Sequence, residues 1–333
     1  MIILEDDRLE FRFPEVHEAA RCSIDFQRTL RIPDDGKDYP LPPGLGSFPL
    51  RHVDDFAARL PETWRRRGGV MTPMHQAEAL WINFHPGYPF AVKVATGKVC
   101  AITGDSWVNH LNGGPQDYVV LPDQPWLDGY CVEKGVIRQF VAMPLGEGYT
   151  AEEQITGAAQ TGGLQIVAYP MKAERYEALS RRLEDERAAF GEVMFSESPG
   201  MGLAPGGRMR QHIEEDEHGL DAWDQRHGSR CFVSIVNTAQ WMAITGERPP
   251  TEPPTAAAYT ANGLPWFDYY GSDATALPGS DTLKGLTSIA QHAKAAGKAP
   301  RPDNETIAVP HVVALGGTPR RQVREPAAGE AWA

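Results

Sequence analysis

Hydrophobic and polar residues alternate over long stretches of the chain, as they do in half-buried β-strands. Residues Cys22–Ile32 alternate with one interruption at Arg28, and a Pro-Asp-Asp-Gly turn signal follows at 33–36. Further strand-like runs, separated by short turn segments, lie at Phe90–Val94, Tyr118–Leu121, Val136–Ala142 and Leu164–Tyr169. Short strands at close intervals predict a mainly β protein built as a sandwich or a barrel.

Two segments carry helical signals. Val53–Arg67 has acidic residues near its start and basic residues at its end. These signals predict one or two short helices in this segment, with a break at Pro61. Ala173–Phe190 places Tyr176 and Leu179 near one face among many charges, so the sequence predicts its longest helix there. The expected class is therefore a β-rich α+β fold with a few helices.

One part of the chain is similar to a later part. Residues 81–105 align without a gap on residues 223–247, with nine identities in 25 positions. Two shorter blocks recur in the same order: a P-W-x-D-x-Y pattern at Pro125–Tyr130 and Pro265–Tyr270, and a Pro/Gly-rich turn at Pro43–Pro49 and Pro199–Pro205. This predicts an internal duplication, with two sandwich-like or barrel-like units in a pseudo-twofold arrangement.

The duplication implies a division of the chain into five parts. They are an N-terminal strand segment at 1–42, a first β-rich unit at 43–172, a helical connector at 173–198, a second β-rich unit at 199–315 and a mobile tail at 316–333. The repeated tripeptides Thr103–Asp105 and Thr245–Glu247 are expected to be strand-ending turns, in which glycine supplies a positive φ.

The repeated P-W-x-D-x-Y pattern offers the first candidate site. On a strand its aromatic, acidic and aromatic residues share one face. The candidate ligand-binding residues are Trp126, Asp128 and Tyr130, their counterparts Trp266, Asp268 and Tyr270, and the equivalent loop histidines His85 and His227. Flat rings stack on sugar faces or cations, and a carboxylate accepts hydrogen bonds. The alternative is architectural, with both tryptophans largely buried and both aspartates bonded to nearby backbone.

The same segments allow an enzymatic alternative. Asp128 or Asp268 would act as acid or base, and Arg138, which shares a strand face with Val136 and Phe140, would be partly buried beside a paired carboxylate. Both copies of the motif are intact, which favours binding or architecture, because a duplicated enzyme usually keeps one working site.

Motifs for metal binding, phosphate binding and covalent catalysis are weak or missing in the sequence. The string His212–His218 contains two histidines and four acids, but it matches no metal-binding pattern, and we expect an acidic loop. Gly200–Gly207 lacks the ending and context of a phosphate-binding loop. No nucleophile elbow, cysteine-nucleophile motif or dinucleotide fingerprint occurs, so we expect neither a metal nor a cofactor.

Composition and charge limit the classes of partner that the protein is expected to bind and the compartment in which it is expected to work. The 44 acidic and 32 basic residues give a net charge of −12, which argues against a nucleic-acid surface. No apolar stretch approaches the length of a membrane helix, and the N-terminus turns acidic at Glu5, unlike a signal peptide. The four cysteines form no C-x-x-C pair and are expected to be reduced and mostly buried. These features predict a cytoplasmic protein.

Distinctive sequence segments lie at Gly44–Leu50, Gln124–Gly129 and Arg138–Gly146. In these three segments the chain resembles a family of uncharacterised bacterial proteins, and the resemblance extends over most of its length. It implies no activity, and this sequence contradicts the integral-membrane label that some relatives bear. We therefore expect a non-catalytic, soluble binding or assembly protein with a small polar, polyol or sugar-like ligand or a protein partner. The alternative is a hydrolase or isomerase acting on a small polar substrate.

Overall fold

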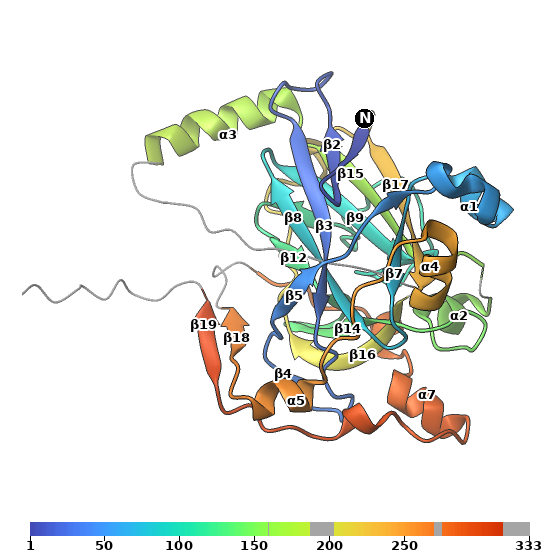
Figure 1. Ribbon diagram of the computed structural model, residues 1–333. Coiled ribbons are helices and arrows are strands. Elements are labelled where there is room, and N and C mark those ends of the chain that lie inside the picture. Colours follow the sequence, from blue (N-terminus) through green and yellow to red (C-terminus); the bar gives the residue numbers. More distant parts are fainter. Residues whose placement is uncertain (159, 187–202, 270–274, 316–333) are drawn as a thin grey trace, which may run out of the picture.

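The computed structural model describes residues 1–158, 160–186, 203–269 and 275–315. Within these ranges the chain forms a ten-stranded sheet, a seven-stranded sheet and a two-stranded sheet, with short helices around them (Figure 1). The mainly β class predicted from the alternation of residues is confirmed.

The larger sheet contains the N-terminal strands. Its order is β1 (Ile2–Glu5), β2 (Arg8–Arg12), β3 (Arg21–Thr29), β8 (Ala79–Pro86), β14 (Val136–Ala142), β16 (Leu203–Arg210) and β4 (Asp38–Tyr39). Three strands branch from this path: β5 (Gly44–Ser47) pairs with β3, β12 (Trp126–Leu127) with β8, and β13 (Gly129–Glu133) with β14. Every pairing is antiparallel except that of β16 with β4.

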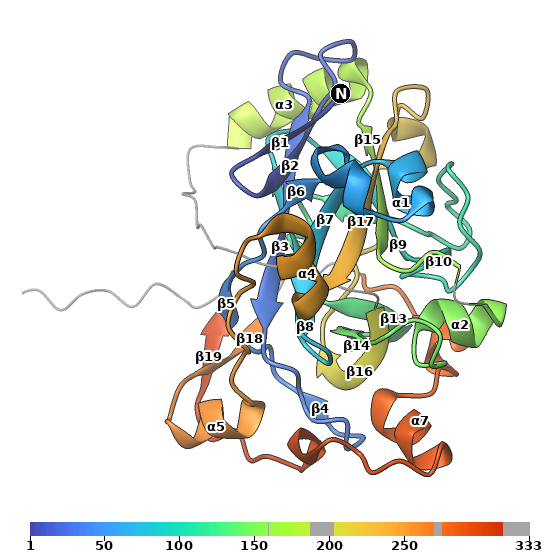
Figure 2. The same ribbon diagram turned by 45° about the vertical axis from the view of Figure 1, so that its right-hand side comes forward.

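The seven-stranded sheet is also mixed, because β17 (Ser229–Asn237) pairs with β7 (Val70–Met74) in parallel, whereas the third sheet is a single parallel pair. The seven-stranded sheet has the order β10 (Val99–Cys100), β9 (Phe90–Thr96), β15 (Leu164–Pro170), β17, β7 and β6 (Arg51–His52), with β11 (Val119–Leu121) paired to β9. The two-stranded sheet joins β18 (Trp266–Tyr269) to β19 (Val312–Leu315) in parallel. It lies beside β5 in both views (Figures 1 and 2).

The two larger sheets share one hydrophobic core. Phe26 and Ile82 of the larger sheet and Val94 of the smaller sheet belong to the same buried cluster. The hydroxyl of Tyr130 in β13 donates a 2.9 Å hydrogen bond to Thr96 Oγ1 in β9, which joins the sheets inside this core. The arrangement is a sandwich of two packed β layers.

The helices are short. They are the 3₁₀ turns η1 (Asp54–Arg59), η2 (Leu220–Ala222) and η3 (Pro302–Asn304), and the helices α1 (Glu62–Arg67), α2 (Ala151–Thr156), α3 (Ala173–Glu186), α4 (Thr238–Thr245), α5 (Ala256–Ala261), α6 (Asp281–Lys284) and α7 (Ile289–Ala295). Pro61 separates η1 from α1, as predicted. Of the helices in the described ranges α3 is the longest, and it begins at the predicted residue.

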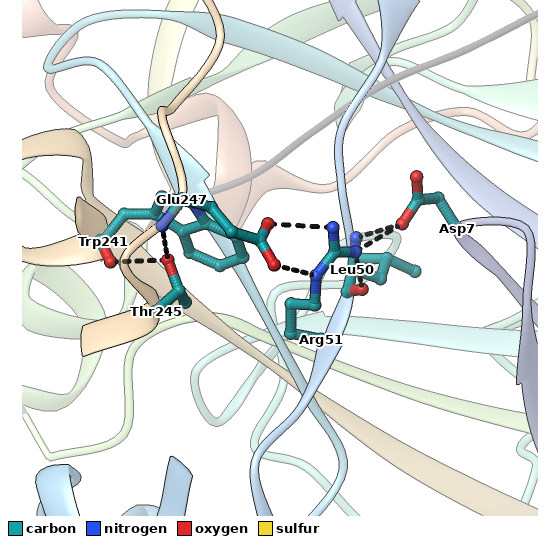
Figure 3. A network of polar contacts seen from close by, with 6 residues as sticks. All are labelled: Asp7, Leu50, Arg51, Trp241, Thr245 and Glu247. Carbon is teal, nitrogen blue, oxygen red and sulfur yellow. Dashed lines mark hydrogen bonds and ion pairs between the residues drawn. The ribbon is translucent and has the colours of Figure 1, made fainter. Parts of the chain in front are cut away.

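One ion-pair network fixes the edge of the smaller sheet. The guanidinium of Arg51 in β6 contacts both carboxylate oxygens of Glu247, at 2.9 and 2.8 Å, and Oδ1 of Asp7 at 3.0 Å (Figure 3). Asp7 belongs to the β1–β2 turn, where Asp6 and Asp7 both have positive φ, the conformation of tight hairpin turns. The network thus ties the N-terminal hairpin to the residue that follows α4.

The structure does not confirm the internal duplication. Trp81 lies in strand β8, whereas Trp223, its counterpart, follows the turn η2. Residues 238–245 form helix α4, but the aligned residues 96–103 end β9 and continue through β10 into a turn. The aligned segments share a strand at 90–95 and 232–237, in β9 and β17, and over most of the remaining length the similarity does not extend to secondary structure.

One repeated tripeptide does keep its local geometry. Gly104 and Gly246 both have φ of 77°, and each N–H donates to the carbonyl four residues earlier. In both copies the threonine hydroxyl accepts a hydrogen bond from the backbone N–H two residues later. The Thr-Gly-Asp/Glu tripeptide therefore specifies the end of a helical turn. The second copy was expected to end a strand, but it ends helix α4.

The two β-rich units expected at 43–172 and 199–315 do not form separate sheets, because strands from both belong to the same sheets. Strand β16 pairs with β14, and β17 pairs with β15 and β7, so strands from 199–315 complete sheets formed by 43–172. Strand β3, from the N-terminal segment, lies between β2 and β8 in the larger sheet. Residues 187–198 of the connector and the tail at 316–333 lie outside the described residues.

All four cysteines are free and buried: Cys22, Cys100, Cys131 and Cys231. Burial raises the pKa of the Cys131 and Cys231 thiols to about 12. In the part of the chain that the structure describes, no helix is both long and apolar enough to cross a membrane.

Candidate functional site

The outer face of the larger sheet carries a row of polar side chains. In the β3–β8 ladder Ser23, Asp25 and Gln27 stand opposite His85, Asn83 and Trp81, respectively. Trp126 of β12 stands opposite Asn83, and Ser47 of β5 opposite Gln27. Directly opposed residues project to the same face, so these eight residues form one surface, which we call the polar face. The alternate residues, such as Ile24 and Ile82, project into the core.

Four residues at the centre of the polar face, Asp25, Gln27, Asn83 and His85, form what we call the Asp25 cluster. The Oδ2 atom of Asp25 lies 2.5 Å from Nε2 of His85, and Oδ1 accepts a 2.7 Å hydrogen bond from Nε2 of Gln27. The side-chain nitrogen of Asn83 lies 3.0 Å from His85 Nε2 and 3.5 Å from Asp25 Oδ2. A buried carboxylate is thus held by neighbours on two strands.

Exposure divides the cluster into a buried acid and an accessible base. The Asp25 side chain is fully buried, whereas the His85 side chain is 32% exposed. Arg8 of β2 brings its Nε to 3.7 Å from Asp25 Oδ2, and its own side chain is 38% exposed. The cluster therefore presents an imidazole and a guanidinium at the surface, with a carboxylate beneath them.

Three buried polar atoms on this face have no hydrogen-bond partner among the described residues. They are Oε1 of Gln27, Nε1 of Trp81 and Oγ of Ser47. Gln27 is opposite both of the others in the ladders, so the three residues occupy the same level on three adjacent strands. An unpaired buried polar atom costs about 1–3 kcal/mol, and three of those found in the described residues lie together here.

The first P-W-x-D-x-Y segment does not form the predicted continuous surface. The strand breaks at Asp128, between β12 and β13. Trp126 is half-buried and belongs to the polar face, whereas Tyr130 is completely buried in the core. Trp126 is less buried than Tyr130 but packs against the core cluster, so the structure does not overturn the expectation that it would be largely buried.

Asp128 is completely buried, as the architectural alternative predicts, but its partner is a side chain. Oδ2 accepts a 2.7 Å hydrogen bond from Nε2 of Gln211, and the Asp128 N–H donates to Gln211 Oε1 at 3.0 Å. Oδ1 has no partner. Burial raises the pKa of Asp128 to about 8, against hydrogen bonds from Trp126 and Gln211 that lower it. This carboxyl has no contact with solvent and is poorly placed for acid–base work on a substrate.

The second copy has a different environment. Trp266 is completely buried, and its Nε1 donates to Thr260 Oγ1 at 3.0 Å. Asp268 forms an ion pair with Arg210 at 2.7 Å instead of bonding backbone. Tyr270 lies outside the described residues. The rings of Trp126 and Tyr269 meet edge to face, with centroids 4.8 Å apart, so the two motifs touch without being equivalent.

The remaining predicted residues are separate from the Asp25 cluster. His227 bonds Asp224 at 2.9 Å within its own loop, so the two histidines have different partners. Arg138 is half-buried, and burial lowers its pKa, but it forms no ion pair with any described residue. The expected paired carboxylate is therefore not found there.

The acidic loop at 212–218 has a structural role. Asp216 accepts hydrogen bonds from the Tyr118 hydroxyl at 2.5 Å and from Trp223 Nε1 at 2.8 Å. The described residues contain no group of three or more His, Cys, Asp or Glu side chains placed to hold a metal ion.

Sequence reasoning found His85 and Trp126 but missed Asp25, Gln27, Trp81 and Asn83. The available signal was the polar half of the alternating strand predicted at Cys22–Ile32, whereas the strand at 79–86, which supplies Trp81 and Asn83, was not predicted. Comparison with family models, with curated proteins and with solved structures finds no match for this chain.

Proposed function

We propose that the protein binds a small, hydroxyl-rich polar ligand on the polar face. The observation that carries this proposal is a set of partly exposed groups on adjacent strands of the polar face, the indoles of Trp81 and Trp126 and the imidazole of His85. A polyol or sugar offers hydroxyl groups that both donate and accept, so it can bond the exposed imidazole while its C–H groups pack against the indoles.

The aromatic residues support the same ligand class. Trp81 and Trp126 are both half-buried, and they stand on neighbouring strands next to Asn83. Indole rings pack against the C–H faces of sugars, while amide, imidazole and carboxylate groups bond their hydroxyls. The assembly role considered from the sequence has no comparable observation among the described residues, and the family resemblance supplies no activity.

The test is a binding screen with matched variants. Thermal-shift and calorimetric titrations would use glycerol, erythritol, glucose and their oligomers. We expect at least one to bind, and Asn83→Ala and Trp126→Ala to weaken it at least tenfold. Trp64→Phe is the control, because Trp64 is a half-buried tryptophan on α1, on the other side of the molecule (Figure 1). No binding by the wild type, or equal loss in the control, would overturn the proposal.

A further inference from the structure

We propose that Asp25 and His85 form an acid–base pair that hydrolyses an ester of the hydroxyl-rich ligand. This inference rests on the proposed function, since it places the reaction on the molecule that the polar face would bind. It replaces Asp128 and Asp268, the acid–base candidates from the sequence, with a different carboxylate and a histidine.

The geometry fixes which nitrogen of His85 can accept a proton. Nε2 lies 2.5 Å from Asp25 Oδ2 and 3.0 Å from the Asn83 side-chain nitrogen, and the closer, charged carboxylate favours the tautomer that carries its hydrogen on Nε2. Nδ1 then bears the lone pair, and it makes no hydrogen bond to any described residue. Gln27 holds the other carboxylate oxygen at 2.7 Å, which fixes the orientation of Asp25. A buried acid that orients a partly exposed imidazole is the arrangement of a general base.

A second aspartate–histidine pair, Asp224 and His227, stabilises a local turn and serves as a comparison. His227 bonds Asp224 three residues away, and Asp224 also accepts the backbone N–H of Arg226 at 3.0 Å. That pair closes a turn. Asp25 and His85 are instead 60 residues apart on two strands, next to unpaired polar atoms.

The reaction needs water and no other co-reactant. His85 Nδ1 takes a proton from a water molecule as its oxygen bonds to the ester carbonyl carbon. The tetrahedral intermediate then breaks its C–O bond to the alcohol, whose oxygen receives the proton from Nδ1. The products are a carboxylic acid and the free polyol, and Asp25 stabilises the imidazolium that forms in between.

Exposure favours hydrolysis over isomerisation. The His85 side chain is 32% exposed, so water can reach the base. Abstraction of a proton from carbon is favoured by exclusion of water from the site, which this open arrangement does not provide. Arg8 Nε, 3.7 Å from Asp25 Oδ2, adds positive charge beside the carboxylate that orients the imidazole.

The test measures acetate release from the monoacetates of glycerol, erythritol and glucose. We expect turnover by the wild type above the buffer rate, and at least tenfold less with His85→Gln and Asp25→Asn. His227→Gln is the matched control, since His227 is also bound to an aspartate and is 38% exposed, and it should retain activity within twofold. Circular dichroism and melting curves would establish that the variants are folded.

Two results would overturn the inference: acetate release by the wild type at the buffer rate, or a loss in His85→Gln no larger than that in His227→Gln. Calorimetry with the free polyols separates this failure from that of the proposed function. Binding without turnover contradicts the acid–base pair alone, whereas absence of binding contradicts the ligand site itself.

Discussion

Trp126 and Tyr269 meet edge to face with their ring centroids 4.8 Å apart, although they come from segments that the sequence presents as repeats of each other. The contact joins β18 to the strand β12 at the margin of the polar face. The two P-W-x-D segments therefore have different structural roles. The first places Trp126 on the polar face, and the second buries Trp266 in the core.

This difference predicts unequal stabilities for the two tryptophan variants. Trp266 is completely buried, so Trp266→Ala should lower the free energy of unfolding by about 3–5 kcal/mol. Trp126 is half-buried, and Trp126→Ala should cost about 1–2 kcal/mol, because less apolar area returns to water. Urea denaturation of both variants measures the difference. Equal losses would mean that the motifs are energetically equivalent after all.

Asp128 predicts a specific pH dependence of stability. Its pKa is about 8 in the folded protein, well above the ordinary value of 3.8, because the carboxyl is buried. Between these pH values the folded state keeps a proton that the unfolded state has lost. The free energy of unfolding should therefore fall as pH rises towards 8, by up to about 1.4 kcal/mol per pH unit, and level off above it.

Asp128→Asn removes that titration while it keeps an oxygen for Gln211. We expect the variant to show a flatter stability profile between pH 5 and 8, measured by urea denaturation at a series of pH values. A variant whose profile follows that of the wild type would show that Asp128 is ionised in the folded protein.

Lys93 and Asp117 form a second buried charge site, in the smaller sheet. The Lys93 ammonium is 1% exposed and lies 2.5 Å from Asp117 Oδ2, and it also donates to the His110 carbonyl at 2.9 Å. Lys93→Met should cost about 3–5 kcal/mol because it leaves a buried carboxylate unpaired, and the added change Asp117→Asn should recover part of this loss. The double-mutant cycle checks the coupling, and additive losses would contradict it.

The sequence predicts local features well because they depend on neighbouring residues. Pro61 separates two helical turns, Ala173 begins the longest helix in the described ranges, and the runs at Phe90 and Val136 are strands. Thr-Gly-Asp/Glu likewise specifies one local turn in both places. These elements are set by periodicity, by missing N–H groups and by glycine conformation.

The Asp25 cluster depends on contacts that are distant in sequence. Asp25 lies within an alternating strand, and a polar residue there ordinarily faces solvent. Its partner Asn83 is 58 residues later and becomes its neighbour only through the β3–β8 register. The repeat was misleading for a related reason: residues 238–245 share identities with a strand end, but in their tertiary setting they form a helix against β17 and β7.

The most direct test of the ligand site is a two-dimensional NMR titration that follows the tryptophan indole N–H signals as a polyol or sugar from the binding screen is added. Trp81 and Trp126 are partly exposed on the polar face, so a ligand that packs against their rings should change the chemical shifts of their indole signals. We predict saturable shifts of the Trp81 and Trp126 indole signals, with the Trp64 signal unchanged. Saturable shifts at Trp64 with none at Trp81 and Trp126 would contradict a ligand site on the polar face.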